Sequence, residues 1–140
     1  MKLNKQRAII CDCDGTLCLI DGRDPFDFES ATNDLLNEPV AKLLSIYKKN
    51  NYVILIVSAR EKKYQKLTEE WLKKYSIPYD NIFLRSDNDY RSDDIIKKEI
   101  YENAIKPNWN VEVVLDDRNR VVKMWRGAGL PCFQVNEGDF

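Results

Sequence analysis

Three groups of polar residues follow apolar stretches of the chain, at spacings that suit chemistry. Asp12 and Asp14, separated by one residue, come after the apolar run AIIC. Ser58 and Arg60 come after a second apolar run, and the acidic pair at 116–117 comes after a third. Carboxylates at the edge of an apolar core need a compensating partner, because loss of water disfavours their charged form. These acids therefore predict a cation site or a reaction centre.

The chemistry that fits these acids is magnesium-assisted reaction at a phosphate. Carboxylate oxygens are the hard ligands that Mg²⁺ prefers, with water and substrate phosphate completing its shell. An aspartate held beside Mg²⁺ and a phosphate can act as a nucleophile and form an aspartyl-phosphate. A second carboxyl two residues further on can protonate the leaving oxygen and then activate water. We expect Asp12, Asp14, Asp116 and Asp117 to share one crevice.

A lysine falls on the apolar side of a predicted helix. At 100° per residue, Asp93, Lys97, Ile100 and Ala104 share one face. An unpaired buried ammonium is costly, so Lys97 is expected to reach an anionic site at the sheet edge, anchored by Asp93 one turn earlier. The alternative is a lysine whose charged end extends to solvent and forms only that i,i+4 ion pair.

The elements that must position these residues alternate between strand and helix patterns. Buried strands are predicted at 7–12, 52–58, 82–85, 111–115 and 132–135, and helices from Pro39, over 61–75, over 92–105 with Ser92 as N-cap, and around Val121, Val122 and Trp125. Such alternation predicts a three-layer, Rossmann-like α/β fold, with a parallel sheet covered by helices on both faces. Because ligand sites of parallel sheets gather at the carboxyl ends of strands, the polar groups should converge there.

Composition limits the class of protein. A chain of 140 residues with 44% apolar residues and 32% charged residues fits a single globular domain over 1–140. No apolar run approaches the ~20 residues that span a bilayer, and MKLNKQR lacks a signal-peptide pattern, so a cytoplasmic location without membrane contact is expected. The chain has no histidine and no C-x-x-C pair, which disfavours zinc and disulfide frameworks and predicts buried thiols. No glycine lies in a P-loop or G-x-G-x-x-G frame, which excludes a kinase or dinucleotide site in this chain.

Taken together, the motifs resemble those of a known family. D-x-D-G-T after a strand, Ser58 after a second strand, a helical lysine and an acidic pair after a later strand resemble the haloacid dehalogenase superfamily of phosphohydrolases. The flanking segments DGRDPFDFE, VSARE and VLDDRNR are similar to the 3'-phosphatase domain of phage polynucleotide kinase-phosphatase. The resemblance implies a magnesium-dependent phosphatase acting on the 3'-phosphate ends of DNA or RNA.

The resemblance also implies roles for individual residues. Asp12 would be the nucleophile and Asp14 the general acid/base, with Thr16 supporting the phosphate loop and Ser58 bonding the phosphate. Lys97, oriented by Asp93, would neutralise the phosphoryl oxygens. Asp116 and Asp117 would complete the magnesium shell with Asp12 and the backbone carbonyl of Asp14. Arg23 and Arg60 would lie near the substrate phosphate, where a guanidinium fork suits bidentate contact.

Structural readings of the same residues remain open at this point. The pair at 116–117 could instead be the acidic first turn of the next helix, Ser58 a strand-end cap, and Arg23 and Arg60 surface charges. The aromatic residues Trp71, Trp125 and Tyr64 are expected in the core rather than as a base-stacking platform.

The spacing of the motifs bears on the substrate. About 45 residues separate the first two motifs, which leaves no room for a large cap domain, and an open site favours a nucleic-acid end. The basic residues between Arg118 and Arg126 are candidates to track the strand. The alternatives are a phosphatase for small nucleotides or phosphosugars, and a phosphate-binding module without turnover.

Overall fold

A five-stranded parallel sheet forms the centre of the protein. The computed structural model describes residues 4–140, and its main strands are β1 (Gln6–Cys11), β4 (Val53–Glu61), β5 (Asn81–Arg85), β6 (Trp109–Asp116) and β7 (Cys132–Gln134). They lie in the order β5-β4-β1-β6-β7, so the chain builds the sheet outward from β1 in both directions. All four neighbouring pairs are parallel, which confirms the predicted sheet.

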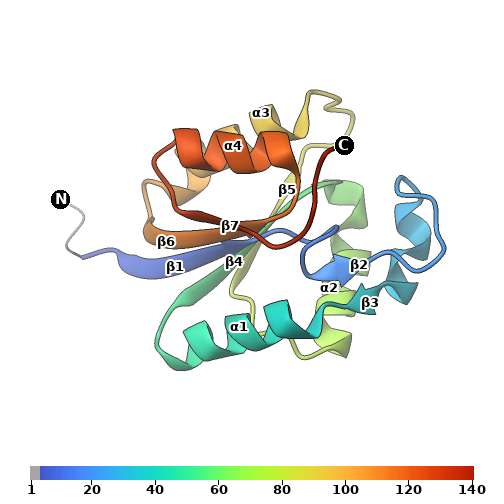
Figure 1. Ribbon diagram of the computed structural model, residues 1–140, viewed down its shortest axis with the longest axis horizontal. Helices are drawn as coiled ribbons and strands as arrows, with labels where there is room; N and C mark the ends of the chain where they lie inside the picture. Colours follow the sequence, from blue (N-terminus) through green and yellow to red (C-terminus); the bar gives the residue numbers. More distant parts are fainter. Residues whose placement is uncertain (1–3) are drawn as a thin grey trace.

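Helices cover both faces of this sheet, as Figure 1 shows. α1 (Glu38–Lys49) and α2 (Gln65–Lys74) pack on one face, and α3 (Asp93–Ile100) and α4 (Asn119–Gly127) pack on the other. Alternate residues of each strand serve the two sides: Ile9 and Cys11 join the core under α1 and α2, while Ala8 and Ile10 join the core under α3 and α4. The three-layer α/β fold predicted from the sequence is confirmed.

The aromatic and cysteine residues take largely the places that were expected. Trp71 and Trp125 are buried on opposite faces of the sheet, and Tyr64 is half-buried with its ring 5.3 Å from that of Phe28. All four cysteines are buried and unpaired. Within residues 4–140, no helix combines the length and apolarity needed to cross a bilayer.

Two predicted boundaries differ from the structure. β4 continues to Glu61, three residues beyond the predicted end, and the short helix η2 (Lys62–Tyr64) then leads into α2. The pairing of β4 with β5 shifts register between Ser58 and Glu61, and such a bulge redirects side chains near the end of a strand. Arg60 therefore lies within the strand and is 1% exposed.

The helix predicted over 92–105 is the second difference. α3 ends at Ile100 and continues as a π-helical turn, η3 (Tyr101–Ile105). Ser92 occupies the N-cap position, but its hydroxyl donates to the Asp94 carboxylate rather than accepting a backbone N–H. Ser92 thus stands at the predicted position without forming the expected side-chain cap.

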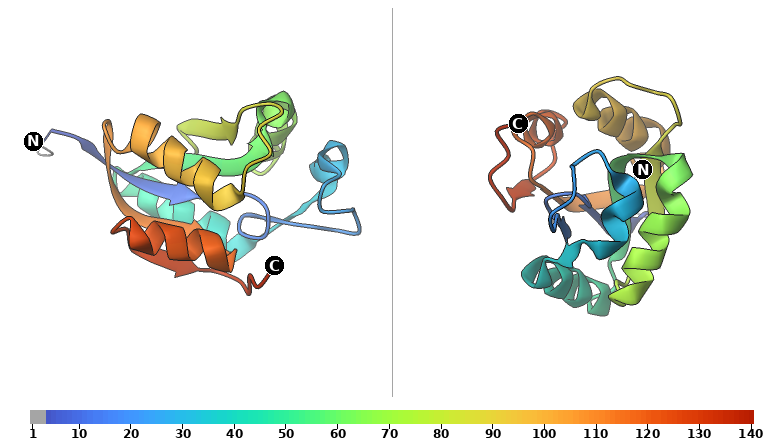
Figure 2. Two further views of the ribbon diagram at one scale, coloured as in Figure 1. Left: turned by 90° about the horizontal axis from the view of Figure 1, so that it is seen from above. Right: turned by 90° about the vertical axis from the view of Figure 1, so that its right-hand side faces the viewer.

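A small hairpin stands where a cap domain would be inserted. Between β1 and α1 the chain forms β2 (Cys18–Leu19), η1 (Phe28–Asn33) and β3 (Leu35–Leu36), with β2 and β3 paired antiparallel. Figure 2 shows this segment projecting beyond the carboxyl edge of the sheet. The absence of a large cap in residues 4–140 agrees with the prediction.

A tight turn joins β1 to this hairpin. The carbonyl oxygen of Cys13 accepts backbone N–H bonds from Thr16, Leu17 and Cys18 at 3.1, 3.0 and 2.9 Å. Gly15 has φ +83°, and a Cβ atom there would lie 2.1 Å from Oδ2 of Asp117. The glycine thus permits both the backbone conformation and the approach of Asp117.

We predict that Gly15→Ala costs more stability than Gly22→Ala. Both glycines have positive φ, but a Cβ at Gly22 meets nothing within 4 Å. In Gly22→Ala, backbone strain alone should lower the free energy of unfolding by about 1 kcal/mol. In Gly15→Ala, the clash with Asp117 adds to this strain, so the free energy of unfolding should fall by at least about 2 kcal/mol. Urea denaturation measures both, and equal losses would contradict the close approach.

Candidate active site

Three buried carboxylates meet at the carboxyl edge of the sheet. Asp12 follows β1, Asp116 ends β6, and Asp117 is the next residue; they are 5%, 1% and 4% exposed. β1 and β6 are neighbours, and the backbone N–H of Asp12 donates to the carbonyl of Leu115 at 3.0 Å. One oxygen of each carboxylate lies within 4.8 Å of the others. The pair at 116–117 lies before α4, whose N-cap is Arg118, so the reading as the acidic first turn of the next helix is wrong.

Lys97 lies between two of these acids. Its Nζ donates to Oδ1 of Asp12 and to Oδ2 of Asp116, at 2.8 Å in each case, and the residue is 2% exposed. The ammonium group of Lys97 thus enters the carboxylate cluster from α3, which packs on the same face of the sheet as α4. The alternative of a solvent-directed lysine is wrong.

The prediction that Asp93 anchors Lys97 is also wrong. In residues 4–140 no ion pair joins them; Asp93 instead accepts from Nη2 of Arg85 at 2.8 Å and from Nη1 of Arg118 at 2.7 Å. The physical reason is direction: Lys97 turns inward to two buried carboxylates, whereas Asp93, one turn earlier, lies at the partly exposed end of α3. Asp93 ties α3 to β5 and to the segment after β6.

Charge in the cluster is unbalanced. Burial raises the pKa of Asp12 well above its ordinary value, and the charge of Asp116 raises it further. Burial also raises the pKa of Asp117. Burial alone would lower the pKa of Lys97, but the carboxylates of Asp116 and Asp12 outweigh it and raise that pKa. Three carboxylates facing one ammonium leave two formal negative charges in excess when all are ionised.

The donor set fits a divalent cation with oxygen ligands. Asp116 is already engaged, since Oδ1 accepts the Asp117 N–H at 2.9 Å and Oδ2 accepts the Trp125 indole N–H at 3.1 Å as well as Lys97. Asp12 and Asp117 are less occupied: Thr16 donates one hydroxyl, 3.0 Å from Asp12 and 3.4 Å from Asp117. Mg²⁺ accepts such carboxylates and neutralises their excess charge.

A second charge cluster holds Asp14. Arg60 binds its carboxylate bidentately, with Nη2 to Oδ1 at 2.7 Å and Nε to Oδ2 at 3.0 Å, and Arg23 adds a bond of 3.1 Å. The Arg23 fork also binds Asp34 at 2.7 and 2.9 Å. Phe28 lies against both guanidinium groups, with ring-centre distances of 5.5 Å to Arg23 and 5.4 Å to Arg60. Both arginines are held within the site, so the reading as solvated surface charges is wrong.

Ser58 lies beside this cluster on β4. It is fully buried, and its Oγ accepts the backbone N–H of Arg60 at 3.2 Å. This bond matches the strand-end cap considered from the sequence, and it leaves the hydroxyl proton available to an acceptor.

Two residues of the charged network were not singled out from the sequence. Arg85 ends β5 and could have been found by the same strand-end rule, because it too follows an apolar run. Asp34 could not, since it precedes the short strand β3 rather than ending a strand of the parallel sheet; it is fully buried beside two arginines from distant segments.

Comparison with known families settles the class of protein. Residues 6–140 match the family model described as the polynucleotide kinase PNKP phosphatase domain. The chain belongs to this family. It is therefore a phosphatase of the haloacid dehalogenase type.

Relatives of the PNKP phosphatase domain differ in length from this chain. A chain in the structure titled "Structure of the Pnkp1/Rnl/Hen1 RNA repair complex" is 51% identical with a TM-score of 0.95, covering 97% of this chain and 44% of that one. A protein of Autographa californica nuclear polyhedrosis virus, assigned as a bifunctional polynucleotide kinase/RNA ligase, is 30% identical over 128 residues, or 89% of this chain and 18% of the viral protein. The chain thus spans less than half of either relative.

A more distant likeness concerns the fold alone. The class C acid phosphatase from Bacillus anthracis with tungstate bound has a TM-score of 0.67 at 16% identity, covering 98% of this chain and 69% of that one.

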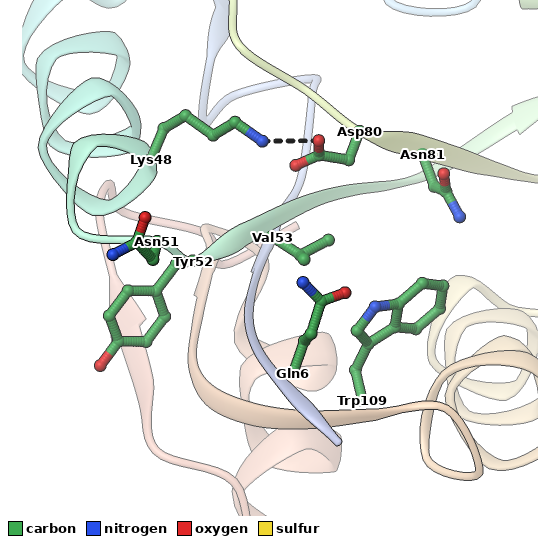
Figure 3. Close-up of a pocket in the computed structure, with 8 residues that line it drawn as sticks. All are labelled: Gln6, Lys48, Asn51, Tyr52, Val53, Asp80, Asn81 and Trp109. Carbon is green, nitrogen blue, oxygen red and sulfur yellow. Dashed lines mark hydrogen bonds and ion pairs between the residues drawn. The ribbon is translucent and has the colours of Figure 1, made fainter. Parts of the chain in front are cut away.

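A hollow at the opposite edge of the sheet is separate from the PNKP-type site. It has a volume of about 390 Å³ and lies at the amino ends of the strands, between residues that include Gln6, Lys48, Asp80 and Trp109 (Figure 3). Lys48 and Asp80 form an ion pair of 2.6 Å there. The acids and arginines described above do not line it, so it has no part in the candidate active site.

We predict that Mg²⁺ stabilises the protein through Asp117. A cation that binds only the folded state adds about 2.7 kcal/mol at a hundred times its Kd, which raises the melting temperature. Asp117→Asn should lose most of this increase, whereas Glu102→Gln, which changes an exposed acid on η3, should keep it. Calorimetry with Mg²⁺ and with EDTA measures the difference. An unchanged melting temperature, or an equal shift in Asp117→Asn, would contradict the assigned cation site.

Proposed function

We propose that this domain is a Mg²⁺-dependent polynucleotide 3'-phosphatase that works through an aspartyl-phosphate on Asp12. The observation that carries the proposal is the buried group of Asp12, Asp116 and Asp117 around Lys97, in a chain of the PNKP phosphatase family. A relative 51% identical occurs in a complex titled as an RNA repair complex, which supports nucleic-acid ends as the substrate. The cytoplasmic location expected from the sequence stays a prediction.

The first step in this proposal is attack by a carboxylate oxygen of Asp12 on phosphorus. The new O–P bond forms as the bond from phosphorus to the 3'-oxygen breaks, and Asp14 gives its proton to that leaving oxygen. Lys97 keeps Asp12 oriented through its 2.8 Å bond, and Thr16 holds the other oxygen at 3.0 Å. A bound Mg²⁺, held by Asp12, Asp117 and Asp116 with the Asp14 backbone carbonyl, would neutralise charge on the phosphoryl oxygens.

The second step releases phosphate. Asp14 takes a proton from water as the water oxygen attacks phosphorus, and the bond between phosphorus and Asp12 breaks. This frees inorganic phosphate and restores both carboxyl groups to their starting states. Ser58 and Lys97 are assigned to hold the phosphate oxygens through both steps.

Asp14 must leave its arginine partners to do this work. Its carboxylate accepts three N–H bonds from Arg60 and Arg23, so both of its oxygens face guanidinium groups and neither is free to face a leaving oxygen. A substrate phosphate is the natural competitor, because guanidinium forks bind phosphate bidentately. In this proposal, the phosphate draws Arg23 and Arg60 toward itself and frees Asp14 to face the 3'-oxygen.

The surroundings of the site favour a macromolecular end over a small ester. The segment between β1 and α1 is a short hairpin with one 3₁₀ helix, and Figure 2 shows it standing beside the carboxyl edge of the sheet. An edge without a large cap leaves space for a strand to continue past the scissile phosphate.

The test is phosphate release from 3'-phosphorylated DNA and RNA oligonucleotides, compared with a 3'-mononucleotide and p-nitrophenyl phosphate, with and without Mg²⁺. We expect Mg²⁺-dependent release with a higher kcat/KM on an oligonucleotide. Asp12→Asn should lower kcat by at least about 10⁴-fold while leaving circular dichroism and the cooperative thermal transition unchanged.

Each of the other outcomes would overturn one part of the proposed function. Faster turnover of the small esters would reject polynucleotide ends as the substrate, and saturable binding without turnover would reject catalysis. Activity retained in Asp12→Asn would reject the nucleophile.

A further inference from the structure

The geometry points to a path for the strand that carries the 3'-phosphate: past Arg60 and over the exposed side chains of Lys62, Lys63, Lys66 and Tyr90. We name these four residues the lysine–tyrosine surface. The inference rests on the proposed function and adds where the rest of the polynucleotide binds.

The lysine–tyrosine surface begins at the edge of the candidate active site. Arg60, which binds Asp14, is only two residues from Lys62, and η2 starts where β4 ends. Figure 2, in the view that faces the carboxyl edge, shows η2 and α2 running beside the β1–α1 hairpin. A strand that places its terminal phosphate between the arginines and Lys97 can therefore leave the site past Lys62, which is two residues from Arg60.

Two hydrogen bonds bring Tyr90 to the same side. The backbone N–H of Lys63 donates to Oδ1 of Asp87 at 2.8 Å, and the backbone N–H of Asn88 donates to Oε2 of Glu61 at 2.9 Å. These bonds fasten the 86–92 loop, which follows β5, to the start of η2. Tyr90 is 80% exposed, and its hydroxyl donates to Asn88, so the ring is fixed at one end and open on its faces.

The lysines of this surface have few ion-pair partners. Lys62 and Lys66 make no ion pair with any residue of 4–140, and Lys63 has only a long one of 3.7 Å to Glu61. They border a hollow of about 520 Å³ along η2 and α2. Unpaired ammonium groups beside an exposed aromatic ring are the combination that binds single strands, through phosphates and base stacking respectively.

The basic segment on α4 is a weaker candidate than the sequence suggested. Arg118 is held by Asp93 and lies 4.5 Å from the ring centre of Phe140, and Arg126 donates to the carbonyl of Cys132. Arg126 is exposed but keeps this bond, so Arg120 and Lys123 are the exposed basic residues of the segment whose side chains make no hydrogen bond or ion pair within residues 4–140. This contrast selects the lysine–tyrosine surface and supplies a matched control.

The test compares Lys62→Ala/Lys63→Ala and Tyr90→Ala with Arg120→Ala/Lys123→Ala. For a 3'-phosphorylated dodecamer we expect kcat/KM to fall about tenfold or more in the first two variants. Tyr90→Ala removes a stacked base, worth ~1–3 kcal/mol, and the double lysine variant removes two phosphate contacts. The slope of log kcat/KM against log salt should flatten by about 1.4 in the double lysine variant, since each phosphate contact on a single strand adds ~0.7. Turnover of p-nitrophenyl phosphate should stay unchanged in all three variants.

Binding is measured alongside turnover, by fluorescence anisotropy of the same dodecamer on the Asp12→Asn background. Weaker binding in the lysine and Tyr90 variants would support the path even if the wild type proves catalytically silent, which separates this inference from the proposed function. Binding and turnover unaffected by those variants, or reduced instead by Arg120→Ala/Lys123→Ala, would overturn it. Equal losses on the dodecamer and on p-nitrophenyl phosphate would also overturn it, because they would report damage to the fold.

An independent observation concerns Asp34. We infer that Asp34 is a positioning residue for Asp14, acting through the two arginines. Its carboxylate is fully buried, accepts both Nε and Nη2 of Arg23, and lies 3.5 Å from Nη2 of Arg60; its carbonyl accepts the Trp71 indole N–H at 2.9 Å. Asp34 thus balances part of the guanidinium charge and leaves Asp14 replaceable by a phosphate. Without it, both arginines would hold Asp14 more strongly.

The test compares two substrates whose leaving groups differ in their need for a general acid. A general acid matters for an alkoxide such as a 3'-oxygen but little for p-nitrophenolate, so kcat/KM on a 3'-phosphorylated dinucleotide should fall at least tenfold more than on p-nitrophenyl phosphate in Asp34→Asn. Asp14→Asn should show the same selective loss. Trp71→Phe, which keeps an aromatic side chain but removes the N–H that binds the Asp34 carbonyl, should show a smaller loss of the same kind and serves if Asp34→Asn does not fold. Equal losses on both substrates in these Asp34 and Trp71 variants would overturn the inference.

Discussion

The buried ammonium of Lys97, shared between Asp12 and Asp116, is the interaction on which the rest of the site depends. Two acids from neighbouring strands repel each other when both lose water, and removing a partner from such a buried pair typically costs about 3–5 kcal/mol. The sheet brings the acids together because β1 and β6 are adjacent and parallel. α3 supplies the lysine from above, so sheet order and helix placement are both requirements of the site.

A single turn divides this charge between two clusters. Asp12 faces Lys97 and Asp117, while Asp14, two residues later, faces Arg60 and Arg23. Gly15 follows directly; its positive φ turns the chain back, and its lack of a Cβ leaves space for Asp117. In the proposed mechanism, one D-x-D-G-T segment supplies both the nucleophile, beside the cation site, and the general acid, beside the two arginines. The different surroundings of Asp12 and Asp14 thus follow from the path of the backbone between them.

Much of this arrangement could be predicted from the sequence, and the reason is local. The apolar runs define the strands, and polar residues that end parallel strands must share an edge, which placed Asp12 and the acids at 116–117 together. Side-chain contacts between segments that are distant in the sequence could not be predicted in this way, because these rules use only local patterns. The bulge that keeps Arg60 within β4 depends on pairing with β5, and the partners of Asp93 are Arg85 and Arg118 rather than the lysine one turn away.

The central claim is that the acids of two strands enclose one divalent cation beside Lys97. A crystal grown with Mn²⁺ in place of Mg²⁺ tests it most directly, because anomalous scattering locates the ion without reference to activity. The account predicts one strong peak within bonding distance of Asp12 and of Asp116 or Asp117, on the side of Asp12 away from Lys97. A fully occupied peak elsewhere, or no peak at saturating Mn²⁺, would contradict it.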